Sequence, residues 1–158
     1  MTVLQRLTRP MLAGIFIYGG IDSARSPHPK APAAERVVGG VVDQLGVRVE
    51  TAQVVRANGV VQVVAGSALA LGVWARPAAA VLAASLVPTT LAGHRFWDEQ
   101  EATGRHQQRI QFLKNVAMMG GLVLAAADTG GRPSLPWRAK RAVGHAAGQV
   151  RERSPIPG

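Results

Sequence analysis

The stretch NGVVQVVAGSALALGVWA, residues 58–75, decides the fold of this chain because it carries no charged side chain. Two further stretches, residues 77–93 and 110–127, are similarly apolar and contain no acid, and Lys114 is their one basic residue. A helix needs about 20 apolar residues to cross a bilayer. The sequence therefore predicts membrane spans, and the few polar residues inside them become the main clue to function.

The N-terminal segment predicts a fourth span. Residues 7–24 would form a helix of about 27 Å at 1.5 Å per residue, enough to cross the hydrocarbon core. Arg6 and Arg9 followed by an apolar run also fit a cleaved signal peptide. Asp22 favours retention, since signal peptides seldom place an acid so close to the cleavage region. We expect an all-α polytopic membrane protein, a four-transmembrane-helix bundle with spans at about 7–24, 54–75, 77–94 and 109–127.

Bulk composition favours a membrane protein over a soluble one. Mean hydropathy is only +0.13, because polar residues 25–56 and a basic tail dilute the spans. A soluble helical bundle should show polar faces, whereas Ser85 is the only hydroxyl in residues 78–88. The net charge of +9 would suggest nucleic acid in a soluble protein. Because the excess lies mainly in the tail, we expect no nucleic-acid partner.

Redox centres held by this chain are not predicted. Without cysteine, the chain forms neither disulfides nor thiolate-ligated iron–sulfur centres. Among its four histidines only His94 abuts a predicted span, which argues against a haem held by two facing histidines. We predict no metal site and no catalytic residue, and no cofactor motif is evident.

The charges also predict the orientation of the chain. Positive residues gather on the cytoplasmic side of membrane proteins. Arg6, Arg9, Arg76 and the basic tail fall on one side, while residues 25–56 and 94–109 carry balanced charge. We therefore expect both termini to be cytoplasmic, with residues 1–128 as the membrane domain. Residues 129–158 would form a basic cytoplasmic tail facing anionic lipid or protein partners in the plasma membrane of a bacterium.

The segment between the first two spans has two parts. Residues 27–32, PHPKAP, predict an extended linker. Apolar residues then recur at helical spacing from 37 to 45, which predicts a short amphipathic helix ending at Gly46. This helix would lie flat on the outer membrane face or, alternatively, pack as a soluble-type helix on the loop. Thr51 is expected to cap the following span.

Polar side chains of all four spans converge on the outer half of the predicted bundle. A charge in hydrocarbon costs from about 3 to over 10 kcal/mol, so it must face a partner, a cavity or the interface. We therefore predict an outward-facing polar pocket. Its candidate ligand-binding residues are Asp22, Asn58, Gln62, Thr89, Thr90, His94, Arg109, Lys114 and Asn115.

Within this pocket we expect Asp22 to pair with Lys114 or Arg109. Pro88 removes one helical hydrogen bond and would open the third span beside the two threonines. Two alternative interpretations that involve no ligand stay open. Lys114 would merely extend to the interface, and the amides would only form interhelical hydrogen bonds worth about 0.6–2 kcal/mol each. Either gives a tight bundle without a ligand site.

Several motifs are similar to those of the DoxX family of small four-span bacterial membrane proteins. They are VPTTLAGHRFW at residues 87–97, RIQFLKN at 109–115, GGL at 120–122, DT at 128–129 and RANG at 56–59. The resemblance extends over roughly residues 5–138. Many members place a His-Gly pair in the first span, and here the matching pair is Gly19-Gly20. This departure removes the basis for any role assigned to that histidine.

The resemblance implies a membrane subunit or platform of a redox or oxidative-stress complex, because the family is named for subunits of quinone-linked systems. It implies a quinone or lipid as the pocket's ligand, and membrane lipids, redox proteins or further copies of the chain as partners. The alternative is a lipid-binding, transport or membrane-assembly factor without redox chemistry. A third interpretation is a purely structural oligomer. We do not expect the chain to be catalytic by itself.

Overall fold

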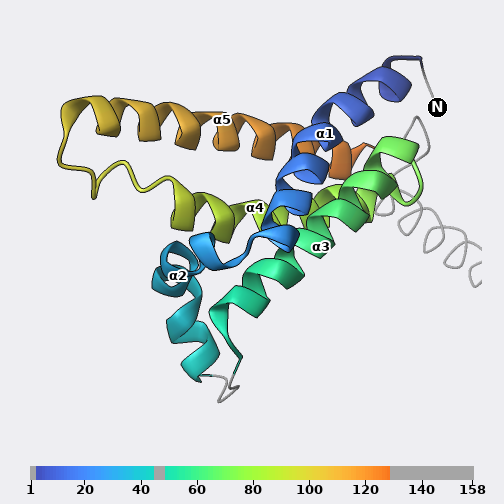
Figure 1. Cartoon of the computed structure of the whole chain (residues 1–158). Helices are drawn as coiled ribbons and strands as arrows, with labels where there is room; N and C mark the ends of the chain where they lie inside the picture. The colour runs from blue at the N-terminus through green and yellow to red at the C-terminus, as the bar shows by residue number, and fades with distance from the viewer. Residues whose placement is uncertain (1–2, 45–48, 129–158) are drawn as a thin grey trace, which may run out of the picture. The chain divides into compact units, whose positions relative to one another are not determined.

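The computed structural model describes residues 3–44 and 49–128, and the side chains of residues 40–44 are not described. The described part of the chain consists of helices and their connections, with no strand, as predicted for an all-α protein (Figure 1). The elements are α1 (Val3–Arg25), η1 (His28–Lys30), α2 (Ala31–Gln44), α3 (Thr51–Leu71), α4 (Ala75–Gly93) and α5 (Ala102–Ala127). Residues up to Ala127 form one compact unit. The predicted basic tail, residues 129–158, lies outside the described residues.

Three helices, α3, α4 and α5, are long and apolar enough to cross a membrane. They coincide with three of the four predicted spans. The fourth, residues 7–24, lies within α1, which has 23 residues and so has the length of a span. Arg6, Arg9, Asp22 and Arg25 fall within α1, and α1 is not among the three helices that have the apolar stretch of a span.

A tight turn joins α3 to α4. Gly72 adopts a left-handed backbone with φ 72°, and its N–H donates to the carbonyl of Leu69 at 3.1 Å. Glycine meets no Cβ penalty in this conformation, which makes it a common helix terminator. Trp74 also has a positive φ of 51° before α4 begins. The predicted span to residue 75 therefore ends about one turn early, because Gly72 terminates the helix.

The prediction of an extended linker at residues 27–32 was wrong. Residues 28–30 form η1, and α2 follows directly from Ala31. Pro29 and Pro32 fall in the first turns of these helices, where their fixed φ fits and no N–H is needed. The predicted short helix is confirmed as α2, although its expected end at Gly46 lies outside the described residues.

Thr51 does not cap α3 as predicted. The residue before the helix, Glu50, has extended backbone angles and makes no capping bond. The Thr51 hydroxyl instead donates to the Glu35 carboxylate of α2. This contact ties α2 to the start of α3.

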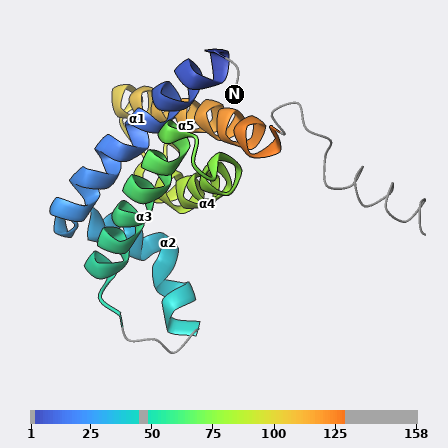
Figure 2. The same cartoon turned by 90° about the vertical axis from the view of Figure 1, so that its right-hand side faces the viewer.

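Helices α1 and α3 pack closely through glycine (Figure 2). A Cβ added to Gly20 would lie 2.6 Å from the carbonyl oxygen of Gly59, and one added to Gly66 would lie 2.9 Å from Ile17 Cγ1. These pairs show that α1 and α3 are antiparallel. Small residues allow such close approach between helices in a membrane.

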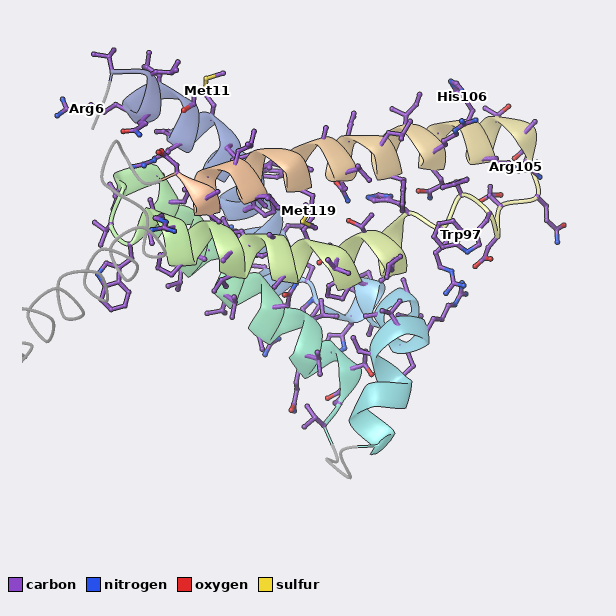
Figure 3. The ribbon with its side chains drawn as sticks, turned by 180° about the vertical axis from the view of Figure 1, so that it is seen from behind. Arg6, Met11, Trp97, Arg105, His106 and Met119 are labelled. Atoms are coloured by element: carbon purple, nitrogen blue, oxygen red, sulfur yellow. The ribbon has the colours of Figure 1, made fainter. Side chains whose placement is uncertain are left out.

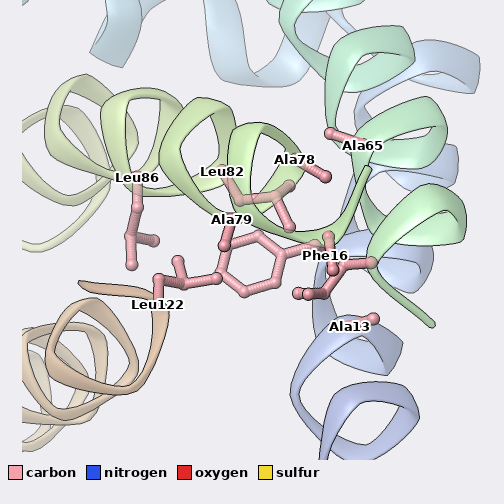
Figure 4. Packing of buried hydrophobic residues seen from close by; sticks show 10 residues of the cluster. Ala13, Phe16, Ala65, Ala78, Ala79, Leu82, Leu86 and Leu122 are labelled. Atoms are coloured by element: carbon pink, nitrogen blue, oxygen red, sulfur yellow. The ribbon is translucent and has the colours of Figure 1, made fainter. Parts of the chain in front are cut away.

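The hydrophobic core is small and rich in alanine (Figure 4). Phe16 of α1 packs among Ala79 and Leu82 of α4 and Leu122 of α5. Leu122 is the only buried residue of α5. The turn from α3 to α4 lies at this core, and we call this end of the helices the turn end. The opposite end, where α2 lies, is called the α2 end.

Candidate functional site

Gln62 forms the most buried polar contact at the α2 end. Its side chain is 5% exposed, and its Nε2 donates to Ser85 Oγ at 2.9 Å, joining α3 to α4. One turn closer to the α2 end, Asn58 Nδ2 donates to Thr89 Oγ1 at 3.4 Å. These bonds match the interpretation of the amides as interhelical hydrogen-bonding groups.

Helices α4 and α5 are joined in the same way. Asn115 Nδ2 donates to Thr90 Oγ1 at 2.9 Å, and His94 Nδ1 lies 2.9 Å from Gln108 Oε1. The Thr90 hydroxyl in turn donates to the Leu86 carbonyl at 2.7 Å. Each bond satisfies a polar group that would otherwise face an apolar environment. Asn58, Gln62, Thr89, Thr90, His94 and Asn115 therefore gather at the α2 end.

The predicted pairing of Asp22 with Lys114 or Arg109 is not formed. Asp22 Oδ2 instead accepts a bond from Lys30 Nζ at 2.6 Å, and the same ammonium donates to Ser23 Oγ at 2.8 Å. Lys114 Nζ donates to Gln111 Oε1 on its own helix at 3.0 Å. Both Lys114 and Arg109 are exposed. Lys30 is nearer to Asp22 because η1 turns the chain back over the end of α1.

A cavity of about 590 Å³ lies among these groups, and all five helices and η1 contribute to its wall. Five predicted site residues line it, namely Asn58, Gln62, Thr89, His94 and Asn115. Asp22, Thr90, Arg109 and Lys114 do not. Thr90, Asp22 and Lys114 each bond to a lining residue. Direct ligand contacts from Arg109 and Lys114 remain predictions without support from the cavity wall.

Sequence reasoning missed Lys30 as a site residue. Lys30 lines the cavity together with Ser23 and Gln111. The available signal was an acid and a base eight residues apart, Asp22 and Lys30, on either side of Pro27 and Pro29. Proline favours turns as well as extended chain, and the turn would have brought the two charges together.

The cavity is polar on one side and apolar on the other. Lys30, Asn58 and Asn115 supply hydrogen-bond donors, while Phe16 and Leu86, both 4% exposed, belong to the core and form an apolar floor. Such a wall suits a small amphiphile. Among the described residues, no group of three or more His, Asp or Glu side chains is arranged to hold a metal ion.

An aromatic cluster fixes the connection between α4 and α5 beside the cavity. Phe96, Trp97 and Phe112 form edge-to-face pairs with ring centroids 5.1–5.9 Å apart, and the Arg95 guanidinium lies 5.7 Å from the Trp97 ring. Figure 3 shows Trp97 beside the start of α5, at the opposite end from Arg6 and Met11. Aromatic residues of this kind are common at membrane interfaces.

Comparison with known proteins gave one match. The family model described as DoxX matches residues 4–95, more than half of the 158-residue chain. This range includes α1, α3 and α4, whereas the similar motif at residues 109–115 lies outside it. No curated protein and no solved structure matches the chain.

Proposed function

Because this chain belongs to the DoxX family, a family of membrane proteins, we propose that α1 and its three longer apolar helices form four spans in a bacterial plasma membrane, with the α2 end outside. Ala13 and Phe16 of α1 are buried in the core, which supports a retained first span. Removing α1 would uncover the glycine face of α3. The basic residues at the turn end support cytoplasmic termini.

Topology reporters test this arrangement. We expect an alkaline phosphatase fused after Val49 or after Gln100 to be active outside, and a fluorescent protein fused after Trp74 or after Gly158 to be active inside. The physical reason is that four crossings return the chain to its starting side. An external C-terminus would contradict the four-span proposal, because a chain that starts in the cytoplasm and ends outside crosses the membrane an odd number of times.

The cavity is the observation that supports a ligand-binding role. Its volume of about 590 Å³ falls within the roughly 300–1,000 Å³ of small-molecule sites. Lys30, Asn58 and Asn115 line the cavity and would donate their remaining N–H groups to the carbonyl groups of a quinone head, while the apolar floor would accept its ring. The protein would serve as the membrane subunit of a redox or oxidative-stress complex, with the electron chemistry on partner proteins.

Extraction from native membrane followed by mass spectrometry of bound small molecules tests this role. We expect quinone to be enriched with the wild-type protein. The Ala92→Phe variant fills part of the cavity wall and should lower the enrichment about tenfold, equivalent to about 1.4 kcal/mol of binding free energy. Ala84→Phe on the same helix is the matched control, because Ala84 is exposed and does not line the cavity.

The identity of the bound molecule separates the two functional classes. Enrichment of phospholipid or glycolipid without quinone would favour a lipid-binding, transport or assembly role, since the Lys30 ammonium also suits an anionic head group. Equal quinone in the Ala92→Phe and Ala84→Phe preparations would show that the quinone lies outside this cavity.

A further inference from the structure

The wall of the cavity is incomplete between α1 and α5. Ile15 and Gly19 line it from α1, and Gln111, Asn115 and Met118 line it from α5. The two helices nevertheless make few contacts with each other. They meet nearer the turn end, where a Cβ on Gly121 would lie 3.6 Å from Leu12.

Two residues of α1 show that this side is open. Ile15 lines the cavity and is also 54% exposed, so its side chain reaches both the interior and the surface. A Cβ added to Gly19 would meet no atom within 4 Å, although Gly19 lines the same cavity. The opposite wall therefore stands away from α1 at this level.

On the other sides, specific contacts join the helices around the cavity. Asn115 and Thr90 join α5 to α4, and the close glycine packing joins α1 to α3. Over the α2 end, Ala33, Ala34 and Val38 of α2 line the cavity as a roof. The bond from Lys30 to Asp22 ties η1, just before this roof, to α1.

We propose that the gap between α1 and α5 is a lateral portal through which an amphiphile enters from the bilayer. The inference rests on the proposed function, because it requires these helices to lie in a membrane. Residues 111–118 lie at the start of the apolar part of α5, so the gap faces hydrocarbon. The polar head moves toward Lys30 and Asn58 while the chain remains in lipid. The ligand class is therefore a membrane-dissolved molecule with one polar head.

Spin labelling tests the portal without knowledge of the ligand. The chain contains no cysteine, so a label at Met118→Cys reports on the cavity wall alone. Oxygen concentrates in hydrocarbon, whereas a nickel chelate stays in water. In reconstituted bilayers we expect high oxygen and low nickel accessibility at residue 118. Val123→Cys on the exposed side of α5 is the lipid reference, and Gln107→Cys is the aqueous reference.

Two phenylalanine variants then locate the opening. Gly19→Phe, combined with the label at residue 118, should reduce oxygen accessibility at least twofold. Gly14→Phe should leave it unchanged, because Gly14 also has free space around it but does not line the cavity. The comparison is made on protein that elutes as a single species. The label at residue 118 without a phenylalanine substitution tests whether the portal exists, even if neither phenylalanine variant folds.

Several results would contradict the proposal of a portal between α1 and α5. High nickel accessibility would show entry from water past α2, and low accessibility to both reagents would show a sealed cavity. Equal effects of Gly19→Phe and Gly14→Phe would place the opening elsewhere. The accessibility pattern is independent of any bound quinone, so a failure to copurify quinone removes the proposed ligand and leaves the portal measurement intact.

Discussion

Replacing Gly59 with alanine is expected to separate α1 from α3. A Cβ at this position would lie 2.6 Å from the Gly20 carbonyl oxygen and 2.8 Å from the Ala24 nitrogen. Both are backbone atoms, so no side chain can rotate away and the helices must move apart. Overpacking typically costs about 1–3 kcal/mol, and we expect about 3 kcal/mol here. The measurement is the loss of helical circular dichroism on titration of purified protein with sodium dodecyl sulfate.

Gly14→Ala is the matched control within the same helix pair. No atom lies within 4 Å of a Cβ at Gly14, and alanine favours helix over glycine by up to about 1 kcal/mol. The control should therefore unfold at the same or a slightly higher detergent fraction. Coinciding transitions for Gly59→Ala and Gly14→Ala would mean that the helices do not approach as closely as the structure shows.

Asn115→Leu should weaken both ligand binding in the cavity and the contact between α4 and α5. Leucine has a similar size but cannot donate to Thr90, so the bond at 2.9 Å is lost. Interhelical hydrogen bonds in membranes contribute about 0.6–2 kcal/mol, and loss of a donor to the head group adds to this change. We expect about tenfold weaker retention of a decyl-benzoquinone in detergent micelles, equivalent to about 1.4 kcal/mol, measured by equilibrium dialysis.

Lys114→Met, one residue away, should change neither property. Lys114 does not line the cavity, and its ammonium bonds to Gln111 of the same helix, a lining residue that keeps its place without this exposed bond. Comparison of Asn115→Leu with Lys114→Met distinguishes a site in the observed cavity from a site centred on a buried ammonium. If Lys114→Met lowers quinone retention as much as Asn115→Leu, Lys114 acts on the ligand directly or by orienting Gln111, and the site includes the Lys114 ammonium.

The helices could be predicted because apolar length alone specifies them. Residues 77–94 and 109–127 were placed to within a few residues of α4 and of the end of α5. The α5 start at Ala102 was missed, since its first two turns are polar and stand outside the apolar stretch. A hydropathy pattern marks where a helix enters hydrocarbon, whereas the helix itself continues as long as its backbone hydrogen bonds do.

The site could be predicted only in part. Its amides and threonines were identified because polar groups in spans must find partners, and antiparallel packing brought them together. Which basic residue pairs with Asp22 could not be predicted in this way. Lys30 reaches Asp22 through a local turn of η1, whereas Lys114 and Arg109 lie on the exposed surface of α5. Charge and depth restrict where an ion pair forms, but the path of the connecting chain decides which residues meet.

The length of α5 has a consequence for its position in a bilayer. This helix has 26 residues, about 39 Å at 1.5 Å each, but its apolar stretch, residues 110–127, is only about 27 Å long, close to a hydrocarbon core of about 30 Å. Hydrophobic mismatch therefore imposes no tilt on α5, and its bonds to α4, from Asn115 to Thr90 and from Arg76 to the Ala126 carbonyl, hold its inclination. In the four-span arrangement proposed above, the polar first two turns of α5 would stand outside the hydrocarbon, and the α4–α5 bonds rather than lipid thickness would set the distance from α5 to α1.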